Sequence, residues 1–170
     1  MVLNSVNRQR FKLMLLFIIF AAPILTAWGM VEWRVGVPQQ STANGSPAQQ
    51  LPRLEHWPIA EVPEAEATDA RWTLVFDCSV ECIERQDVLW RMHRALGRDA
   101  IRLIRLRIGG EGKTLPGEQL TRWHESPSWR QTNGAWLIDP QGRPALSFSS
   151  SVSAEKMLDD IQHLFKVNAK

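Results

Sequence analysis

The sequence predicts an α/β domain with the element order β-α-β-α-β-β-α, placed behind a single N-terminal transmembrane helix. Three observations support this prediction. An uncharged apolar run extends from Leu13 to Val31, a proline-rich stretch follows it, and only residues 71–170 alternate between strand and helix periodicity. The chain has 170 residues, which is enough for one domain of ordinary size together with such accessory segments.

The composition excludes several classes of protein. The formal net charge is only +2, so a strongly electrostatic binder is excluded and no nucleic-acid partner is expected. Two cysteines are too few for a disulfide-rich mini-protein, a four-thiolate zinc site or an iron–sulfur ferredoxin. The sequence also contains no glycine-rich phosphate loop and no metalloprotease or hydrolase motif.

The apolar run has the length that crosses a bilayer. A helix needs about 20 residues to span about 30 Å of hydrocarbon, and the run has this length without a charge. Arg8, Arg10 and Lys12 precede it, so the positive-inside rule places residues 1–12 in the cytoplasm. A cleaved signal peptide is the alternative, although its apolar core is normally about 7–15 residues long. The sequence therefore predicts a transmembrane anchor over 13–31, in a bacterial inner membrane, with the C-terminal domain in the periplasm.

Residues 32–70 are predicted to be a flexible, proline-rich tether. The stretch contains half of the chain's ten prolines, paired glutamines and no helical or strand period. Four apolar residues within it, Leu51, Leu54, Trp57 and Ile59, form a candidate arm that docks onto the domain. A tryptophan in particular is costly to leave in water.

The domain at 71–170 is divided into elements by its apolar periodicity. The expected elements are a buried strand at 71–77, a helix ending before Gly97, a strand at 101–108 with one polar face, a short helix at 116–123, strands at 134–139 and 144–149, and a helix capped by Ser153. A βαβ unit followed by a ββα unit is the order of a thioredoxin-like domain. The seven arginines between Arg85 and Arg107 are interpreted as a solvated outer face, with docking to an acidic partner or anionic headgroups as the alternative.

Cys78 and Cys82 lie four residues apart at the predicted junction between the first strand and the first helix. The free N–H groups and the dipole of a helix N-terminus stabilise thiolate, the form that attacks disulfides and binds soft metals such as Cu(I). Asp77 and Glu81 flank the pair and are expected to oppose thiolate formation. The spacing favours a redox or copper-binding pair, and a structural disulfide in an oxidising compartment is the alternative.

These features resemble the SCO/SenC family, the thioredoxin-fold, copper-binding assembly factors of cytochrome c oxidase. The local matches are WTLVFDCSVEC at 72–82 and WLIDPQGR at 136–143. The resemblance implies a membrane-anchored assembly factor that uses Cys78 and Cys82 in copper delivery or in thiol reduction at the copper site of the oxidase. Its partner would be a copper-bearing oxidase subunit or another assembly factor.

The chain departs from this family at three places. The strand after the first helix ends in an Asp-Pro-like segment in the family, whereas here Ile108 is followed by Gly109 and Gly110. The prolines that the family has around its cysteines are replaced, and the histidine that serves as its third copper ligand is absent from 131–133. His124 is the histidine of the domain best placed to serve as a ligand instead. Two other functions stay open: a non-catalytic assembly scaffold with a structural disulfide, and a general thiol–disulfide oxidoreductase. If the protein is an enzyme, it is expected to be of the latter type.

Overall fold

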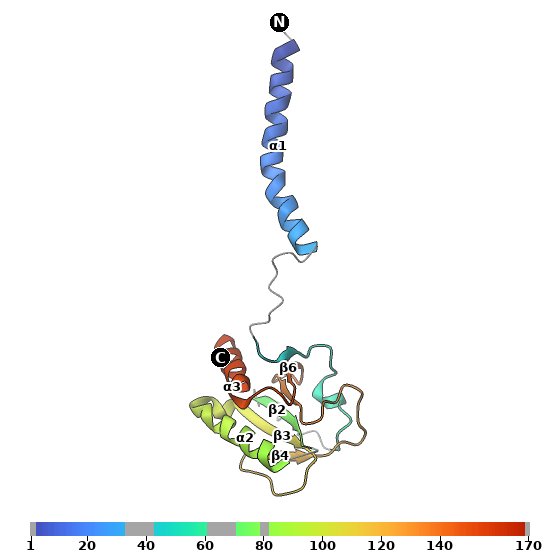
Figure 1. The fold of residues 1–170 in the computed structure, drawn as a ribbon, viewed down its shortest axis with the longest axis vertical. Helices are drawn as coiled ribbons and strands as arrows, with labels where there is room; N and C mark the ends of the chain where they lie inside the picture. The colour runs from blue at the N-terminus through green and yellow to red at the C-terminus, as the bar shows by residue number, and fades with distance from the viewer. Residues whose placement is uncertain (1–2, 33–42, 61–70, 79–81, 169–170) are drawn as a thin grey trace. The chain divides into compact units, whose positions relative to one another are not determined.

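The structure is a computed structural model that describes residues 3–32, 43–60, 71–78 and 82–168. The chain divides into two units, Met1–Ser41 and Thr42–Lys170. The first unit holds one helix, α1 (Leu3–Glu32), which contains Pro23 (Figure 1). Within the ranges just given, no helix meets the combined requirements of length and apolar character for a membrane span. The anchor at 13–31 is not confirmed and stays a prediction.

A six-stranded mixed sheet forms the centre of the second unit (Figure 1). Its strands are β1 (Ser46–Pro47), β2 (Trp72–Asp77), β3 (Leu103–Ile108), β4 (Glu118–Thr121), β5 (Ala135–Ile138) and β6 (Pro144–Phe148). Their spatial order is β1-β6-β5-β2-β3-β4, with β2–β3 and β3–β4 parallel and the other neighbours antiparallel. Because β2 and β3 are parallel, the chain crosses between them through α2 (Cys82–Ala95) and the short helix η2 (Gly97–Arg102).

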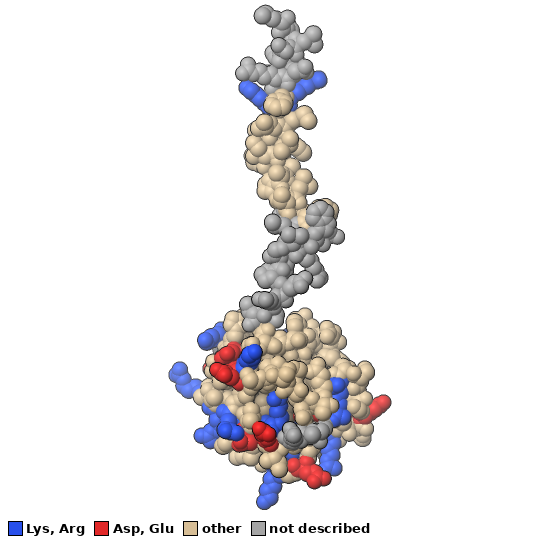
Figure 2. Space-filling model, viewed as in Figure 1, with Lys and Arg blue, Asp and Glu red and all other residues tan. Residues whose placement is uncertain are grey.

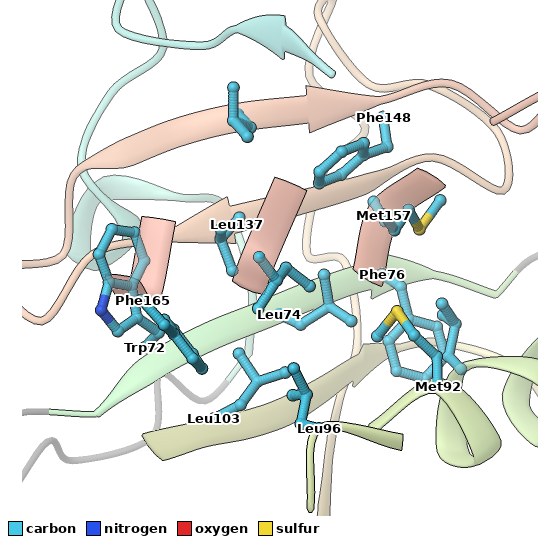
Figure 3. Close-up of a cluster of buried hydrophobic side chains, with 14 of the residues drawn as sticks. Trp72, Leu74, Phe76, Met92, Leu96, Leu103, Leu137, Phe148, Met157 and Phe165 are labelled. Carbon is cyan, nitrogen blue, oxygen red and sulfur yellow. The ribbon is translucent and has the colours of Figure 1, made fainter. Parts of the chain in front are cut away.

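Both long helices of this unit pack on one face of the sheet. Figure 3 shows their apolar side chains meeting those of β2, β3, β5 and β6 in one cluster. The helix after β6, α3 (Ala154–Val167), contributes Met157, Ile161 and Phe165, which recur at helical spacing and are buried. Its N-terminus is capped as predicted, because the hydroxyl of Ser153 accepts a hydrogen bond from the N–H of Lys156.

The opposite face of the sheet is covered by apolar side chains from residues 51–59. Leu54, Trp57 and Ile59 are buried there, and η1 (Leu54–His56) lies within the segment. The ring of Trp57 lies 5.4 Å from that of Trp136 on β5, and its indole N–H donates to the carbonyl of Pro52 at 2.9 Å. The predicted docking of the apolar arm is therefore confirmed. The tether predicted for 32–70 is wrong over 43–60, and its parts at 33–42 and 61–70 lie outside the described residues.

The second predicted helix, at 116–123, is wrong: β4 stands there, at the edge of the sheet beside β3. Pro116 and Gly117 form a turn in which the N–H of Glu118 donates to the carbonyl of Leu115, and Gly117 has a φ of +74°. The chain then pairs with β3, with Glu118 opposite Arg105. The element order of the domain is accordingly β-α-β-β-β-β-α, with β1 added at the other edge.

The surface of the second unit carries charges of both signs. Figure 2 shows basic and acidic side chains interspersed on the visible face, without a large field of one sign. This distribution agrees with the small net charge of the sequence.

Candidate functional site

Cys78 and Cys82 form a disulfide at the junction of β2 and α2, where the sequence places them. Cys78 directly follows β2 and Cys82 is the first residue of α2, with their Cα atoms 4.8 Å apart. The N–H of Cys78 donates to the carbonyl of Ile108 at 3.0 Å, which continues the pairing of β2 with β3 by one residue. The end of the strand therefore fixes one sulfur, and the start of the helix fixes the other.

The two cysteines differ in their access to solvent. Cys78 is fully buried in the cluster between the sheet and the helices, whereas Cys82 is half-buried. Ile83, the next residue along α2, is 78% exposed. A molecule approaching from solvent therefore meets the disulfide on the side of Cys82.

A buried guanidinium group lies against the more accessible sulfur. Nη1 of Arg107, on β3, lies 3.5 Å from Sγ of Cys82. Nη2 of the same side chain donates to the carbonyl of Gly112 at 3.1 Å. Because the side chain of Arg107 has no exposed surface, water screens its charge little at this distance.

Arg107 belongs to a buried charge network with one carboxylate. Glu118, on β4, lies 2.6 Å from Nε of Arg107 and 3.5 Å from Nη1 of Arg105, and all three side chains are fully buried. The amide of Gln86, on α2, donates to the Glu118 carboxylate at 3.0 Å. Among the residues that the structure describes, the network thus holds two guanidinium groups against a single carboxylate.

His93 closes the far end of this network as a neutral imidazole. Its Nδ1 accepts from Nε of Arg105 at 3.1 Å, and its Nε2 lies 2.8 Å from the carbonyl of Ala100. Burial lowers the pKa of His93, and the charge of Arg105 lowers it further, against the opposing effect of the hydrogen bond to Ala100. The imidazole therefore adds no charge to the network near neutral pH.

The interpretation of the arginine-rich segment as a solvated face is wrong for β3. Strand alternation puts Arg105 and Arg107 on the face that α2 covers, together with Leu103, while Leu106 and Ile108 point to the other face. The interpretation holds for three arginines on or just after α2, which are exposed: Arg91, Arg94 and Arg98.

Asp77 does not face the cysteines, which corrects the expectation that it opposes thiolate formation. Its fully buried side chain lies on the opposite face of the sheet, where it forms an ion pair of 3.1 Å with Arg130. It also accepts hydrogen bonds from the indole N–H of Trp123 at 2.7 Å and from the N–H of Asn133 at 3.1 Å. Its charge is therefore compensated away from the disulfide. Glu81, the other flanking carboxylate, lies outside the described residues.

Residues 72–168 match a family model described as a transmembrane-like, thioredoxin-like, C-terminal domain. The chain belongs to this family. The match covers more than half of the chain, from β2 to just beyond α3, and it confirms the thioredoxin-like architecture predicted from the sequence. The comparison with curated proteins gave no match.

Several solved structures resemble this thioredoxin-like chain at low sequence identity. Copper-bound yeast Sco1 is 13% identical, with 59% of this chain and 80% of that chain covered and a TM-score of 0.43. Copper-bound ScoI from Bradyrhizobium japonicum is 16% identical, with 58% of this chain and 88% of that chain covered and a TM-score of 0.40. A secreted thiol-disulfide isomerase from Corynebacterium glutamicum is 12% identical, with 58% of this chain and 72% of that chain covered and a TM-score of 0.40. Sco proteins are thus among the structures that the chain resembles, and the likeness concerns the fold alone.

The thioredoxin-like domain brings two of the three predicted metal ligands together. Cys78 and Cys82 are adjacent, but no group of three or more His, Cys, Asp or Glu side chains in the described part of the chain is arranged to hold a metal ion. His124 lies beyond β4, where its N–H donates to the carbonyl of Pro58 at 2.8 Å. Its role as a third copper ligand is not confirmed and stays a prediction.

A glycine lets the loop after β3 close over the disulfide of the thioredoxin-like domain. Gly110 has a φ of +77°, and a Cβ placed on it would lie 2.5 Å from Sγ of Cys82 and 2.9 Å from the carbonyl oxygen of Cys78. Neither this close approach nor the contact of Arg107 with Cys82 was predicted from the sequence. The pair Gly109–Gly110, directly after an alternating strand, was the available signal for the close approach of this loop to the disulfide.

Proposed function

We propose that the protein is a membrane-anchored thiol–disulfide exchange factor and that Cys78 and Cys82 are its redox pair. The observation behind the proposal is the setting of the disulfide, which joins a fully buried cysteine to a half-buried one, Cys82, with a buried guanidinium nitrogen 3.5 Å from Sγ of Cys82. A structural disulfide needs neither access nor a nearby charge. Exchange requires access, because the reacting thiolate must meet its partner, and a nearby positive charge favours the thiolate over the thiol.

The resemblance to the SCO/SenC family extends this proposal to the assembly of a cytochrome c oxidase. In this role the reduced pair would keep the cysteines of the oxidase copper site reduced, acting on the copper-bearing subunit or on another assembly factor. The uncharged run at 13–31 and the basic residues before it support an anchor in a bacterial inner membrane, with the domain in the periplasm. A periplasmic location also suits a pair that cycles between thiols and disulfide.

Copper delivery is the second candidate function. One observation favours it: two sulfurs that bond to each other when oxidised are close enough to bind the same Cu(I) ion when reduced. Copper would then be cargo that the protein receives and passes on. Cys78 and Cys82 would hold it, with His124 as the candidate third ligand.

The reduced full-length chain, kept in detergent micelles, separates the two functions. Exchange is measured as the rate at which the chain reduces a disulfide-bonded peptide, and copper binding by titrating Cu(I) against a competing chelator. We expect exchange in the native chain and its loss in Cys78→Ser and Cys82→Ser. Tight Cu(I) binding without exchange would favour the second candidate, and the absence of both would leave a scaffold with a structural disulfide.

A complementation experiment tests the place of the protein in oxidase assembly. In the source bacterium, deletion of the gene is expected to lower copper-oxidase activity, and the native gene is expected to restore it. The Cys78→Ser and Cys82→Ser genes are expected not to do so. Full restoration by both variants would overturn a thiol-based role in assembly.

A further inference from the structure

We propose that Cys82, rather than Cys78, is the sulfur that exchanges with the partner, and that Arg107 stabilises its thiolate. This inference rests on the proposed redox function and assigns different roles to the two sulfurs. Three features of the site support it: the difference in access, the unbalanced charge of the buried network, and the contact between the two residues.

The difference in access determines which sulfur a partner can reach. Disulfide exchange requires the attacking sulfur, the attacked sulfur and the leaving sulfur to come into line, so one sulfur of the pair must be open to solvent. Cys78 is fully buried at the end of β2 and lies within the apolar cluster. Cys82 is half-buried at the start of α2, beside the exposed side chain of Ile83. Ile83 therefore offers an apolar contact to a partner docking over Cys82.

Among the described residues, the buried network has one more positive than negative charge. Arg105 and Arg107 carry two positive charges, Glu118 carries one negative charge, and all three side chains are fully buried. His93 contributes no charge, because it is held neutral between Arg105 and Ala100. An uncompensated buried charge is costly, and an anion placed beside it recovers part of that cost. A thiolate on Cys82, 3.5 Å from Nη1 of Arg107, would be that anion.

The other charged groups that the structure describes around the pair do not reverse this balance; Glu81, next to Cys82 in the sequence, lies outside the described residues. On α2, Arg85 lies one turn after Cys82, with Nε and Nη2 buried and without a hydrogen-bond partner in the described structure, so it adds positive potential. Asp77 is paired with Arg130 on the other face of the sheet. The start of α2 adds the partial positive charge of a helix N-terminus. Three further charged residues on the neighbouring elements are exposed and screened by water: Glu84, Glu111 and Lys113.

The reaction that follows from these roles reduces a disulfide of the partner. The Cys82 thiolate attacks one sulfur of that disulfide, its S–S bond breaks, and the other sulfur leaves as a thiolate that takes a proton from water. Cys78 then loses its proton and attacks Sγ of Cys82, forming the Cys78–Cys82 bond and releasing the second partner sulfur as a thiolate. The partner gains two electrons that the cysteine pair loses. A donor dithiol returns them by the same steps in reverse.

Alkylation of single thiols tests the assignment. In the reduced full-length chain, Cys78→Ala leaves Cys82 as the only thiol, and Cys82→Ala leaves only Cys78. The rate of reaction with iodoacetamide is followed by mass spectrometry between pH 5 and 9. We expect Cys82 to react faster than Cys78 at every pH and to reach half of its maximal rate at the lower pH.

The role of Arg107 is tested in the chain that retains only Cys82. Arg107→Met is expected to lower the alkylation rate at pH 6 on the order of tenfold and to move the half-maximal rate to higher pH, because a guanidinium at this distance favours thiolate over thiol. Arg107→Lys keeps the charge and is expected to retain part of the rate. Arg91→Met, which removes an exposed arginine of α2, is the matched control and is expected to change nothing.

A second measurement keeps the test valid if Arg107→Met fails to fold. The two single-cysteine chains, with Arg107 intact, are mixed with oxidised glutathione, and the rate of mixed-disulfide formation is compared. Faster formation at Cys82 supports the assignment. Faster formation at Cys78, or a Cys82 profile that a folded Arg107→Met leaves unchanged, overturns it while the proposed exchange function stands. If neither thiol forms a mixed disulfide, the proposed function itself fails.

Discussion

Removing the carboxylate of the buried network is expected to cost more stability than removing one of its arginines. Glu118→Gln leaves Arg105 and Arg107 buried with no negative partner, so the network goes from one excess positive charge to two. Breaking a buried ion pair in this way costs about 3–5 kcal/mol. Arg107→Met leaves Arg105 and Glu118 as a balanced pair and fills the space with an apolar chain, so we expect a loss of roughly half as much.

Urea unfolding of the oxidised full-length chain, followed by tryptophan fluorescence, measures this difference. The denaturation midpoint is expected to fall in the order native, Arg107→Met, Glu118→Gln, with an unchanged slope. Arg91→Met is the control for loss of a positive charge at the surface and is expected to stay within about 0.5 kcal/mol of the native chain. Two results would refute the assignment of one excess positive charge to the network: a loss below about 1 kcal/mol for Glu118→Gln, or a loss for Arg107→Met that exceeds the loss for Glu118→Gln.

Three further predictions concern the parts of the domain that hold the site in place. Burial lowers the pKa of His93 below its ordinary value of 6.5, so only the unfolded chain takes up this proton as the pH falls below that value. Stability is therefore expected to fall between pH 7.5 and 5.5, and by less in His93→Gln; equal slopes for the two chains would contradict this. A chain that begins at residue 71 loses the buried Leu54, Trp57 and Ile59, at about 1.5–3 kcal/mol each, and is expected to melt well below a chain that begins at Thr42. Equal melting temperatures would show that the segment 43–60 does not contribute to the fold. Ser153→Ala removes the cap of α3 and is expected to lower the free energy of unfolding by about 1 kcal/mol in urea, and no loss would argue against the cap.

The strands and helices with a strong apolar period could be predicted from the sequence. The buried strand β2, the stripe of α3 and the position of the cysteines between β2 and α2 all follow from local patterns. The strand β4 could not be predicted in the same way. It is four residues long and lies at a sheet edge, where it is held by its pairing with β3 and by the ion pair between Glu118 and Arg105. The local sequence pattern contains no information on that pairing.

The burial of the charged side chains at the site could not be predicted for the same reason. Alternating arginines in a strand indicate a solvated face unless the partner that buries them is known, and here that partner is on β4 and α2. The contact of Arg107 with Cys82 depends on the parallel register that sets Arg107 beside Phe76, two residues before Cys78. The segment 43–60 has the proline-rich composition of a linker, and only its apolar residues, Trp57 above all, indicated that it packs on the domain.

The reduction potential of the Cys78–Cys82 pair is the decisive measurement of whether this disulfide exchanges. The full-length chain is equilibrated in redox buffers, and the reduced fraction is counted by alkylation and mass spectrometry. We expect a potential less negative than about −300 mV, the value below which structural disulfides lie, because Arg107 stabilises the reduced form. We also expect Arg107→Met to make the potential more negative. A potential below about −300 mV that Arg107→Met leaves unchanged would contradict the account and indicate a structural disulfide.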